Sequence, residues 1–141
     1  MRRKLRSALQ LQPAERALLW LAWIRLLWVG LALRILPLSK VQLLLSARFR
    51  RPVPVTISPA RLACLVAAAS RHHLLALHCL QRSLVLQSLL RDQGFEVDLR
   101  IGVRRKEGGM EAHAWVEQDG HVIGDVLELV QRYFPLERLA G

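Results

Sequence analysis

Three residues whose types suit nucleophilic catalysis stand in the second half of the chain: Cys79, His113 and Asp125. A cysteine thiolate attacks a carbonyl carbon, a histidine takes up and returns the proton, and a carboxylate holds that histidine in the right tautomer. Taken singly, His113 fits a core histidine and Asp125 a cap at the end of a strand. Their joint presence at compatible positions predicts a catalytic triad.

Cys79 opens a helical pattern that we expect to run from His78 or Cys79 to Gln93, with Gly94 as the residue that ends the helix. Unpaired N–H groups at a helix start stabilise a thiolate, and they can also donate to the oxyanion that forms on carbonyl attack. A purely structural cysteine gains nothing from this position. The apolar face of the helix consists of Leu80, Leu84, Leu86, Leu89 and Leu90.

After Gly94 the apolar period changes from helical to alternating, which predicts strands over about 97–103, 111–117 and 121–126. A three-residue loop, 118–120, pairs Glu117 with His121 and His113 with Asp125. Directly opposed residues share one face of a sheet, so this register brings the carboxylate to the imidazole. A two-residue loop would instead point Asp125 to the opposite side. We therefore expect the three-residue loop.

The flanking segments are predicted to be structural. Ser58 and Pro59 suit the start of a helix in which Cys64 is a small core residue. His78 and His121 compete with His113 as the base, but neither fits as well. His72 and His73 are expected at the surface, and residues 128–134 are expected to form a short helical tail.

Charge divides the chain in two. Residues 1–57 hold eleven Lys/Arg and one acid, a net of +10, whereas residues 58–141 hold ten of each. We interpret 1–57 as a basic, tryptophan-rich helical region for docking or packing, and 58–141 as the catalytic core. A solvated face without a partner is the competing interpretation of the basic residues. The first helix is expected from Pro13 to Leu36, with an apolar face of Trp20, Ile24, Leu27 and Leu31, and a second around 41–45.

Several classes of protein are disfavoured. Two cysteines form neither a disulfide framework nor a zinc pattern. The apolar run of residues 17–38 contains Arg25 and Arg34, and each would cost ~2.5–3.5 kcal/mol near the centre of a bilayer. The run also lacks a signal-peptide cleavage site. No nucleic-acid-binding motif is visible. We expect a cytoplasmic protein without nucleic-acid partner, and contact with a membrane surface is not favoured.

The motifs resemble those of a known family. A cysteine opening a helix, His113-Ala114-Trp115-Val116-Glu117 and Val122-Ile123-Gly124-Asp125 resemble the transglutaminase-like papain superfamily. Residues 79–84 and 99–103, with these segments, look like the split leader peptidase of lasso-peptide biosynthesis. The resemblance implies an α+β fold, N-terminal helices followed by a transglutaminase-like core with the catalytic cysteine packed on a small antiparallel sheet. It assigns the triad to Cys79, His113 and Asp125.

The resemblance also implies the reaction and the partners. The expected function is a cysteine protease that cuts a ribosomally made precursor peptide between leader and core, so that a macrolactam can form. A separate leader-recognition protein and an ATP-dependent lasso cyclase are the implied partners, and no cofactor or metal is expected. Two alternatives stay open at this point: an acyltransferase of the same fold, and a non-catalytic scaffold that docks through the basic helix.

Overall fold

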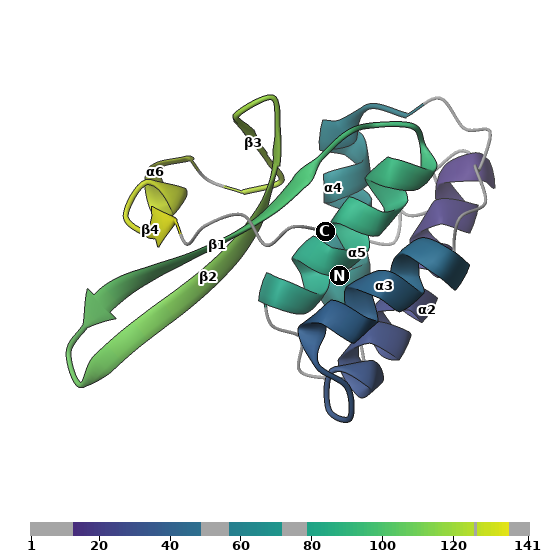
Figure 1. Ribbon diagram of the computed structural model, residues 1–141. Helices are drawn as coiled ribbons and strands as arrows, with labels where there is room; N and C mark the ends of the chain where they lie inside the picture. The colour runs from purple at the N-terminus through teal and green to yellow at the C-terminus, as the bar shows by residue number, and fades with distance from the viewer. Residues whose placement is uncertain (1–12, 49–56, 72–78, 126, 136–141) are drawn as a thin grey trace.

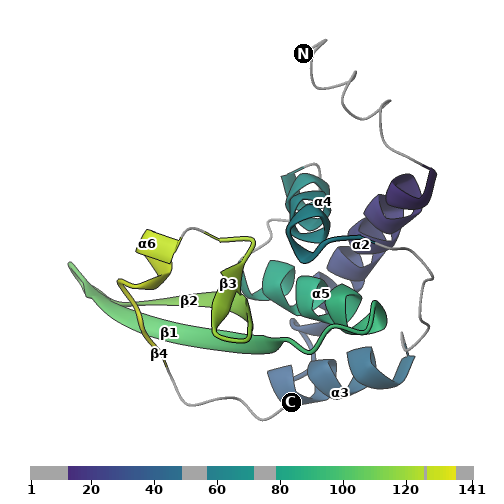
Figure 2. The ribbon, with the colours of Figure 1, turned by 90° about the horizontal axis from the view of Figure 1, so that it is seen from above.

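The fold is described from a computed structural model that places residues 13–48, 57–71, 79–125 and 127–135. A bundle of helices forms one side of the molecule and a sheet with one short helix forms the other (Figures 1 and 2). The expected α+β class is confirmed. The helices are α2 (Pro13–Ala32), α3 (Leu38–Arg48), α4 (Pro59–Arg71), α5 (Cys79–Asp92) and α6 (Leu127–Val130), and the strands are β1 (Asp98–Lys106), β2 (Gly109–Gln118), β3 (His121–Ile123) and β4 (Phe134–Pro135).

Helix α2 begins at Pro13 as predicted, but it ends at Ala32 instead of Leu36, and the face it turns inward is opposite to the predicted one. Leu18, Ala22, Leu26 and Val29 are at most 1% exposed. The predicted apolar face is instead the outer one, where Trp20 is 67% and Ile24 52% exposed. The helix is apolar nearly all round, so the apolar pattern alone could not distinguish the two faces.

The inward face of α2 carries one charge. The guanidinium of Arg25 lies 2.5 Å from the carboxylate of Asp92 at the end of α5, and both side chains are less than a tenth exposed. Arg25 also donates to the hydroxyl of Ser88 at 2.5 Å. Burial raises the pKa of Asp92 above its ordinary value, and the neighbouring Arg25 opposes this shift without cancelling it. The pair therefore links the buried face of α2 to the end of α5.

Helix α4 begins where its capping residues predict. The hydroxyl of Ser58 accepts a hydrogen bond from the backbone N–H of Arg61 at 3.2 Å. The buried stripe of the helix consists of Leu62, Leu65, Val66 and Ala69. Cys64, however, is exposed, so its prediction as a core residue is wrong. It lies between two stripe positions, and the helix turns it toward solvent.

Helix α5 is central to the core. Its residues Leu84, Val85, Leu89 and Leu90 are at most 1% exposed and join one cluster with the buried residues of α2, α3 and α4. The helix ends as predicted at Gly94, whose φ is +86°. The N–H of Phe95 donates to the carbonyl of Leu90, and that of Gly94 to Arg91, the pair of bonds that ends a helix at a left-handed glycine.

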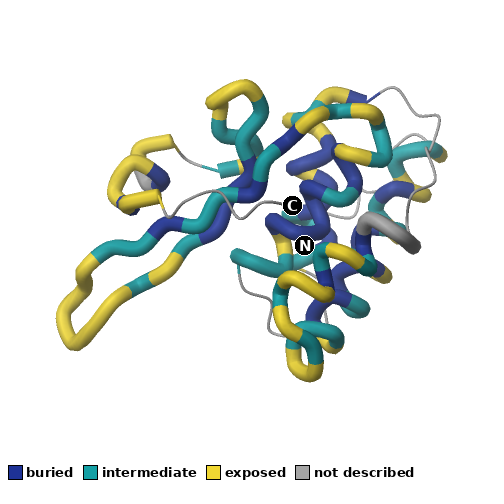
Figure 3. Tube along the Cα trace, in the orientation of Figure 1, coloured by how far each residue is buried: buried dark blue, intermediate teal, exposed yellow. Residues whose placement is uncertain are grey.

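The four strands form one antiparallel sheet in the order β3-β2-β1-β4. Strands β1 and β2 make a long arm whose tip extends past the helices and is exposed (Figures 1 and 3). Alternate residues of β2, Ala114 and Val116, pack on the helices. Trp115 faces the other way, into a second cluster with Val130 and Tyr133. The predicted helical tail is therefore only partly right, because it ends at Val130 and a fourth strand follows.

The hydrophobic core crosses the boundary at residue 57, since buried residues on both sides of it belong to one cluster. The division into a docking region and a catalytic core stays a prediction about roles. Within the part of the chain that the structure places, no helix is both long and apolar enough to cross a bilayer.

Candidate active site

Cys79 is the first residue of α5 and is partly exposed. The buried leucines of this helix hold it against the sheet, so its first turn is fixed next to β2. The hydroxyl of Ser83, one turn after Cys79, donates to the backbone carbonyl of Ala114 at 3.0 Å. This bond ties the start of the helix to the strand beside His113. Ser83 was not predicted, although its spacing of four residues from Cys79 places it on the same helix face.

His113 projects from β2, where its partner across the ladder is Gly102 of β1. Its ring stacks on Tyr133, with centroids 5.1 Å apart, and near Trp115, with centroids 6.0 Å apart. Gly102 provides the room, because a Cβ there would stand 2.7 Å from the Trp115 ring and 2.8 Å from Cβ of Tyr133. Two aromatic side chains thus restrict the rotation of the imidazole.

Asp125 reaches His113, but not through the predicted register. The hairpin has a two-residue loop, Asp119-Gly120, and it pairs Gln118 with His121 and Val116 with Ile123. The three-residue loop was therefore wrong. Asp119 and Gly120 both have positive φ, 50° and 78°, as in the tight hairpin turn that matches strand twist. The Asp-Gly pair carries this signal in the sequence.

The chain then leaves the ladder at Gly124, whose φ is +74°. β3 ends at Ile123, so the strand alternation, which would have turned Asp125 away from His113, no longer applies to the residues that follow. The carboxylate Oδ2 lies 2.5 Å from Nε2 of His113. Gly124 also packs closely on α4, because an added Cβ would stand 2.8 Å from Cβ of Ala63. One glycine therefore turns the chain and permits its contact with the helix.

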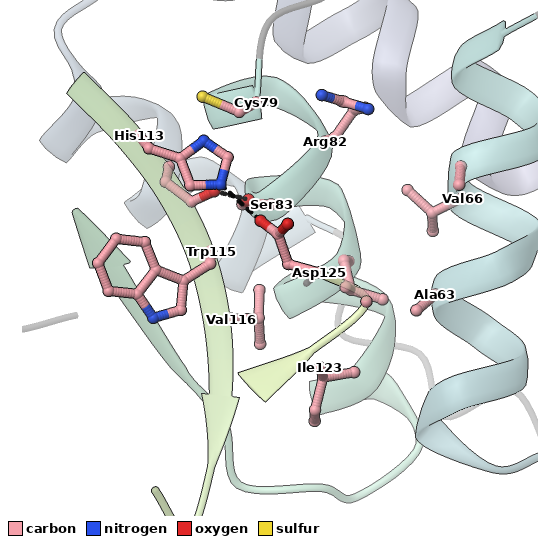
Figure 4. Close-up of a pocket in the computed structure, with 14 residues that line it drawn as sticks. Ala63, Val66, Cys79, Arg82, Ser83, His113, Trp115, Val116, Ile123 and Asp125 are labelled. Atoms are coloured by element: carbon pink, nitrogen blue, oxygen red, sulfur yellow. Dashed lines mark hydrogen bonds and ion pairs between the residues drawn. The ribbon is translucent and has the colours of Figure 1, made fainter. Parts of the chain in front are cut away.

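All three predicted site residues line a single pocket of about 190 Å³ between α4, α5 and the sheet. Figure 4 shows the ring of His113 between the sulfur of Cys79 and the carboxylate of Asp125. Small and aliphatic side chains from the helices, Ala63 and Val66 among them, form the opposite wall. The exposed Arg82 stands on the rim, one turn along α5 from the cysteine.

The hydrogen bond of His113 assigns roles to its two nitrogens. Nε2 is engaged with Asp125, so it carries the proton when the ring is neutral, and Nδ1 is then the nitrogen left for the thiol. The side chains of His113 and Asp125 are largely shielded from solvent, with 14% and 21% of their surface exposed. A carboxylate in this position would also stabilise an imidazolium, should the ring take up a proton from the thiol.

Two further charged groups lie opposite each other on neighbouring strands, Arg104 on β1 and Glu111 on β2. Arg104 donates to Glu111 at 2.8 Å and stands over the ring of Tyr133 at 5.0 Å. This hydrogen bond, followed by charge effects, lowers the pKa of Glu111. The Arg104–Glu111 pair therefore braces the tyrosine that stacks on His113.

The remaining candidates do not join the pocket. Cys64 and His121 are exposed and lie outside its lining. His72, His73 and His78 lie outside the described residues. Trp115 is 2% exposed and forms both core and pocket wall. The ranges placed by the structure contain no group of three His, Cys, Asp or Glu side chains suited to a metal ion.

Comparison with known protein families gives a match. The sequence pattern of the transglutaminase-like superfamily matches residues 11–138, which covers the helices, the sheet and the pocket. No curated protein and no solved structure matches the chain. The superfamily typically comprises enzymes that work through a cysteine, and this supports acyl-transfer chemistry, to water or to another acceptor. Because the match extends over nearly the whole chain, the protein belongs to the transglutaminase-like superfamily.

Proposed function

We propose that the protein is a cysteine protease that removes the leader from a lasso-peptide precursor, with Cys79, His113 and Asp125 as its catalytic residues. The observation that carries the catalytic part is the Nε2–Oδ2 bond between His113 and Asp125 in the pocket that Cys79 also lines. The choice of lasso precursors rests on the sequence motifs around these residues.

The reaction follows from the roles of these groups. Nδ1 of His113 takes the thiol proton, and the thiolate of Cys79 attacks the carbonyl at the leader–core junction. N–H groups at the start of α5 receive the oxyanion. His113 then gives its proton to the leaving nitrogen, and this frees the N-terminus of the core. Water, deprotonated by His113, hydrolyses the thioester while Asp125 stabilises the imidazolium.

The proposal includes partners. The implied set is a precursor peptide, a separate leader-recognition protein and an ATP-dependent cyclase that closes the macrolactam. The basic residues of 1–57 would serve as the docking region. A cytoplasmic location is part of the same proposal.

The direct test is incubation of the protein with a candidate precursor and its recognition protein, followed by mass spectrometry. We expect leader and core as two products with one water added. Cys79→Ala should abolish cleavage, and Cys64→Ser, which replaces the exposed cysteine, is the matched control that should leave it intact. Cleavage by Cys79→Ala would contradict the proposal.

Acyl transfer is the second candidate, and membership of the superfamily supports it. The same thioester would pass its acyl group to an amine rather than to water. The two reactions differ in mass, because hydrolysis adds 18 Da in total whereas amine capture adds the amine or a cross-link. A cross-linked or amidated product would make transfer the better description.

A further inference from the structure

One edge of β2 lacks a strand partner within the described residues and leads to the pocket. β3 pairs with β2 only over Val116–Gln118, whereas β2 begins at Gly109. On the other side, β1 pairs with β2 along its length. The stretch of β2 from Met110 to Ala114 therefore has a ladder on one side only. It lies on the arm that extends past the helices (Figure 1).

The two hairpins decide which backbone groups point to this edge. In a two-residue hairpin the residues flanking the loop exchange both hydrogen bonds, and the pattern alternates from there. Gln118↔His121 is such a pair, so the backbone N–H and C=O groups of Gln118 point toward β3. The same groups of every second residue before it, Val116, Ala114, Ala112 and Met110, point to the same side. Lys106↔Gly109 is the flanking pair of the other hairpin, and it directs the odd-numbered residues of β2 toward β1. The two counts agree.

The backbone groups on this edge of β2 are hydrogen-bonded at Ala114 but face outward at Ala112 and Met110. The carbonyl of Ala114 accepts the hydroxyl of Ser83, so the first turn of α5 stands against the edge there. Ala112 and Met110 are exposed, and the exposed fraction of Met110 is 67%. Their N–H and C=O groups face outward on the same line, two residues apart. An extended chain could pair with both and would meet α5 at Ser83, one turn from Cys79.

We propose that the peptide substrate binds as an added strand on the β2 edge at Ala112 and Met110. The bond between Ser83 and Ala114 ends this pairing, so the peptide must leave the edge there and cross the pocket beside Cys79 and His113. Main-chain hydrogen bonds of this kind give affinity for an extended peptide largely independent of its side chains. The inference deepens the proposed function, since it names how the substrate of the same site is held.

A peptide electrophile tests this apart from the choice of natural substrate. The probe is an epoxysuccinate carrying trialanine on one side and triglycine on the other, so that its two arms differ, and it alkylates a catalytic cysteine while extending in both directions from it. The readout is the rate of Cys79 adduct formation by intact mass, in a Cys64→Ser background. Six isomers, each with a single N-methyl group, are compared with the parent.

We expect N-methylation to slow adduct formation at every second residue of the bound peptide. Methyl groups on residues opposite Ala112 and Met110 remove a hydrogen bond each and should slow the adduct about 2–10-fold. The residue between them should react within about twofold of the parent. The pattern should appear on one side of the epoxide, and that side gives the direction of the bound peptide. A flat profile on both sides would overturn the inference.

A pair of proline variants tests the protein side. Ala112→Pro removes the outward N–H without breaking the β1–β2 ladder, and Arg105→Pro is the control at the opposite edge of the sheet. With rates normalised to alkylation of Cys79 by iodoacetamide, Ala112→Pro should lose at least threefold and Arg105→Pro less than twofold. Equal effects would count against the inference, and if Ala112→Pro does not fold, the N-methyl profile on unaltered β2 decides.

The two proposals fail separately. A periodic profile with a precursor that stays uncut would retain the edge-binding inference and reject the protease assignment. If the precursor is cut but the N-methyl profile is flat, the protease assignment is retained and the edge-binding inference is rejected.

Discussion

Gly124 performs two tasks, and Gly124→Ala should disturb both. Its φ of +74° is one that L-residues adopt at a cost of roughly 1–2 kcal/mol. The added methyl would also stand 2.8 Å from Cβ of Ala63 and 3.4 Å from a methyl of Leu86. Inserting a methyl into such a contact typically costs about 1–3 kcal/mol. Together the two effects predict a loss of about 2–5 kcal/mol in the free energy of unfolding.

A control separates the two costs. Gly120 sits in the same hairpin with a φ of +78°, but nothing stands within 4 Å of its added Cβ. Gly120→Ala should therefore lose only the conformational part, about 1–2 kcal/mol. The difference between the two variants in urea unfolding measures the contact with Ala63. Ala63→Gly, added to Gly124→Ala, should recover part of that difference, after allowing for its own cost in a helix of roughly 1 kcal/mol.

Gly124→Ala and Gly120→Ala should also differ in the reactivity of Cys79. The contact with α4 fixes the backbone of Gly124, and the next residue holds the imidazole. Gly124→Ala should slow alkylation of Cys79 by iodoacetamide in a Cys64→Ser background, whereas Gly120→Ala should leave the rate near that of the parent. If the two variants match in both stability and alkylation rate, the role assigned to Gly124 is wrong.

Three further predictions address the site and its support. Asp125→Ala should lower turnover about 10²–10⁴-fold, and Asp125→Asn less, because an amide oxygen still accepts the Nε2 proton but carries no charge; equal losses would reject the orienting role. Replacing Arg25 or Asp92 alone should cost about 3–5 kcal/mol in urea unfolding, while Arg25→Met with Asp92→Leu should be near neutral or stabilising. Because burial raises the pKa of Asp92, this pair stabilises less as the pH rises through that pKa, so the double variant should gain relative to the parent over the same rise. Gly102→Ala should cost about 1–3 kcal/mol by crowding Trp115, and an unchanged unfolding midpoint would contradict that contact.

Local signals predicted the elements better than their contacts. Ser58 and Gly94 act on their own helices, so their roles as a cap and an end could be inferred from neighbours in the sequence. The hairpin count failed because both loop lengths suit Asp119-Gly120, and the choice between them was based on where Asp125 had to point. In the structure Gly124 removes that condition by turning the chain after β3 has ended. A glycine next to a predicted catalytic aspartate was the available signal.

Contacts made by distant segments left no such signal. Tyr133 reaches His113 only because the chain crosses the sheet after α6 and returns along β1. The inner face of α2 carries Arg25, and its partner Asp92 lies 67 residues later, so no residue near Arg25 in the sequence indicated the pair. The roles of Cys79 and its partners were predicted from residue types, and their placement needed tertiary structure.

The burial of α2 changes how its proposed docking role should be tested. Deleting residues 1–57 would remove Leu18, Leu26 and Val29, each worth about 1.5–3 kcal/mol when fully buried, and would also expose their partners on α4 and α5. A loss of several kcal/mol is comparable to the whole stability of a domain, so the truncated chain should not fold cooperatively. Lost activity would then say nothing about docking.

Substitutions on the outer face avoid this difficulty. Trp20→Gln and Leu31→Gln change side chains that are 67% and 46% exposed, so each should alter stability by no more than about 0.5 kcal/mol. If this face docks the recognition protein, the variants should weaken precursor cleavage in its presence yet leave iodoacetamide alkylation of Cys79 unchanged. A folded, cooperatively melting 58–141 fragment would refute the packing argument, and unimpaired cleavage by both glutamine variants would place the docking surface elsewhere.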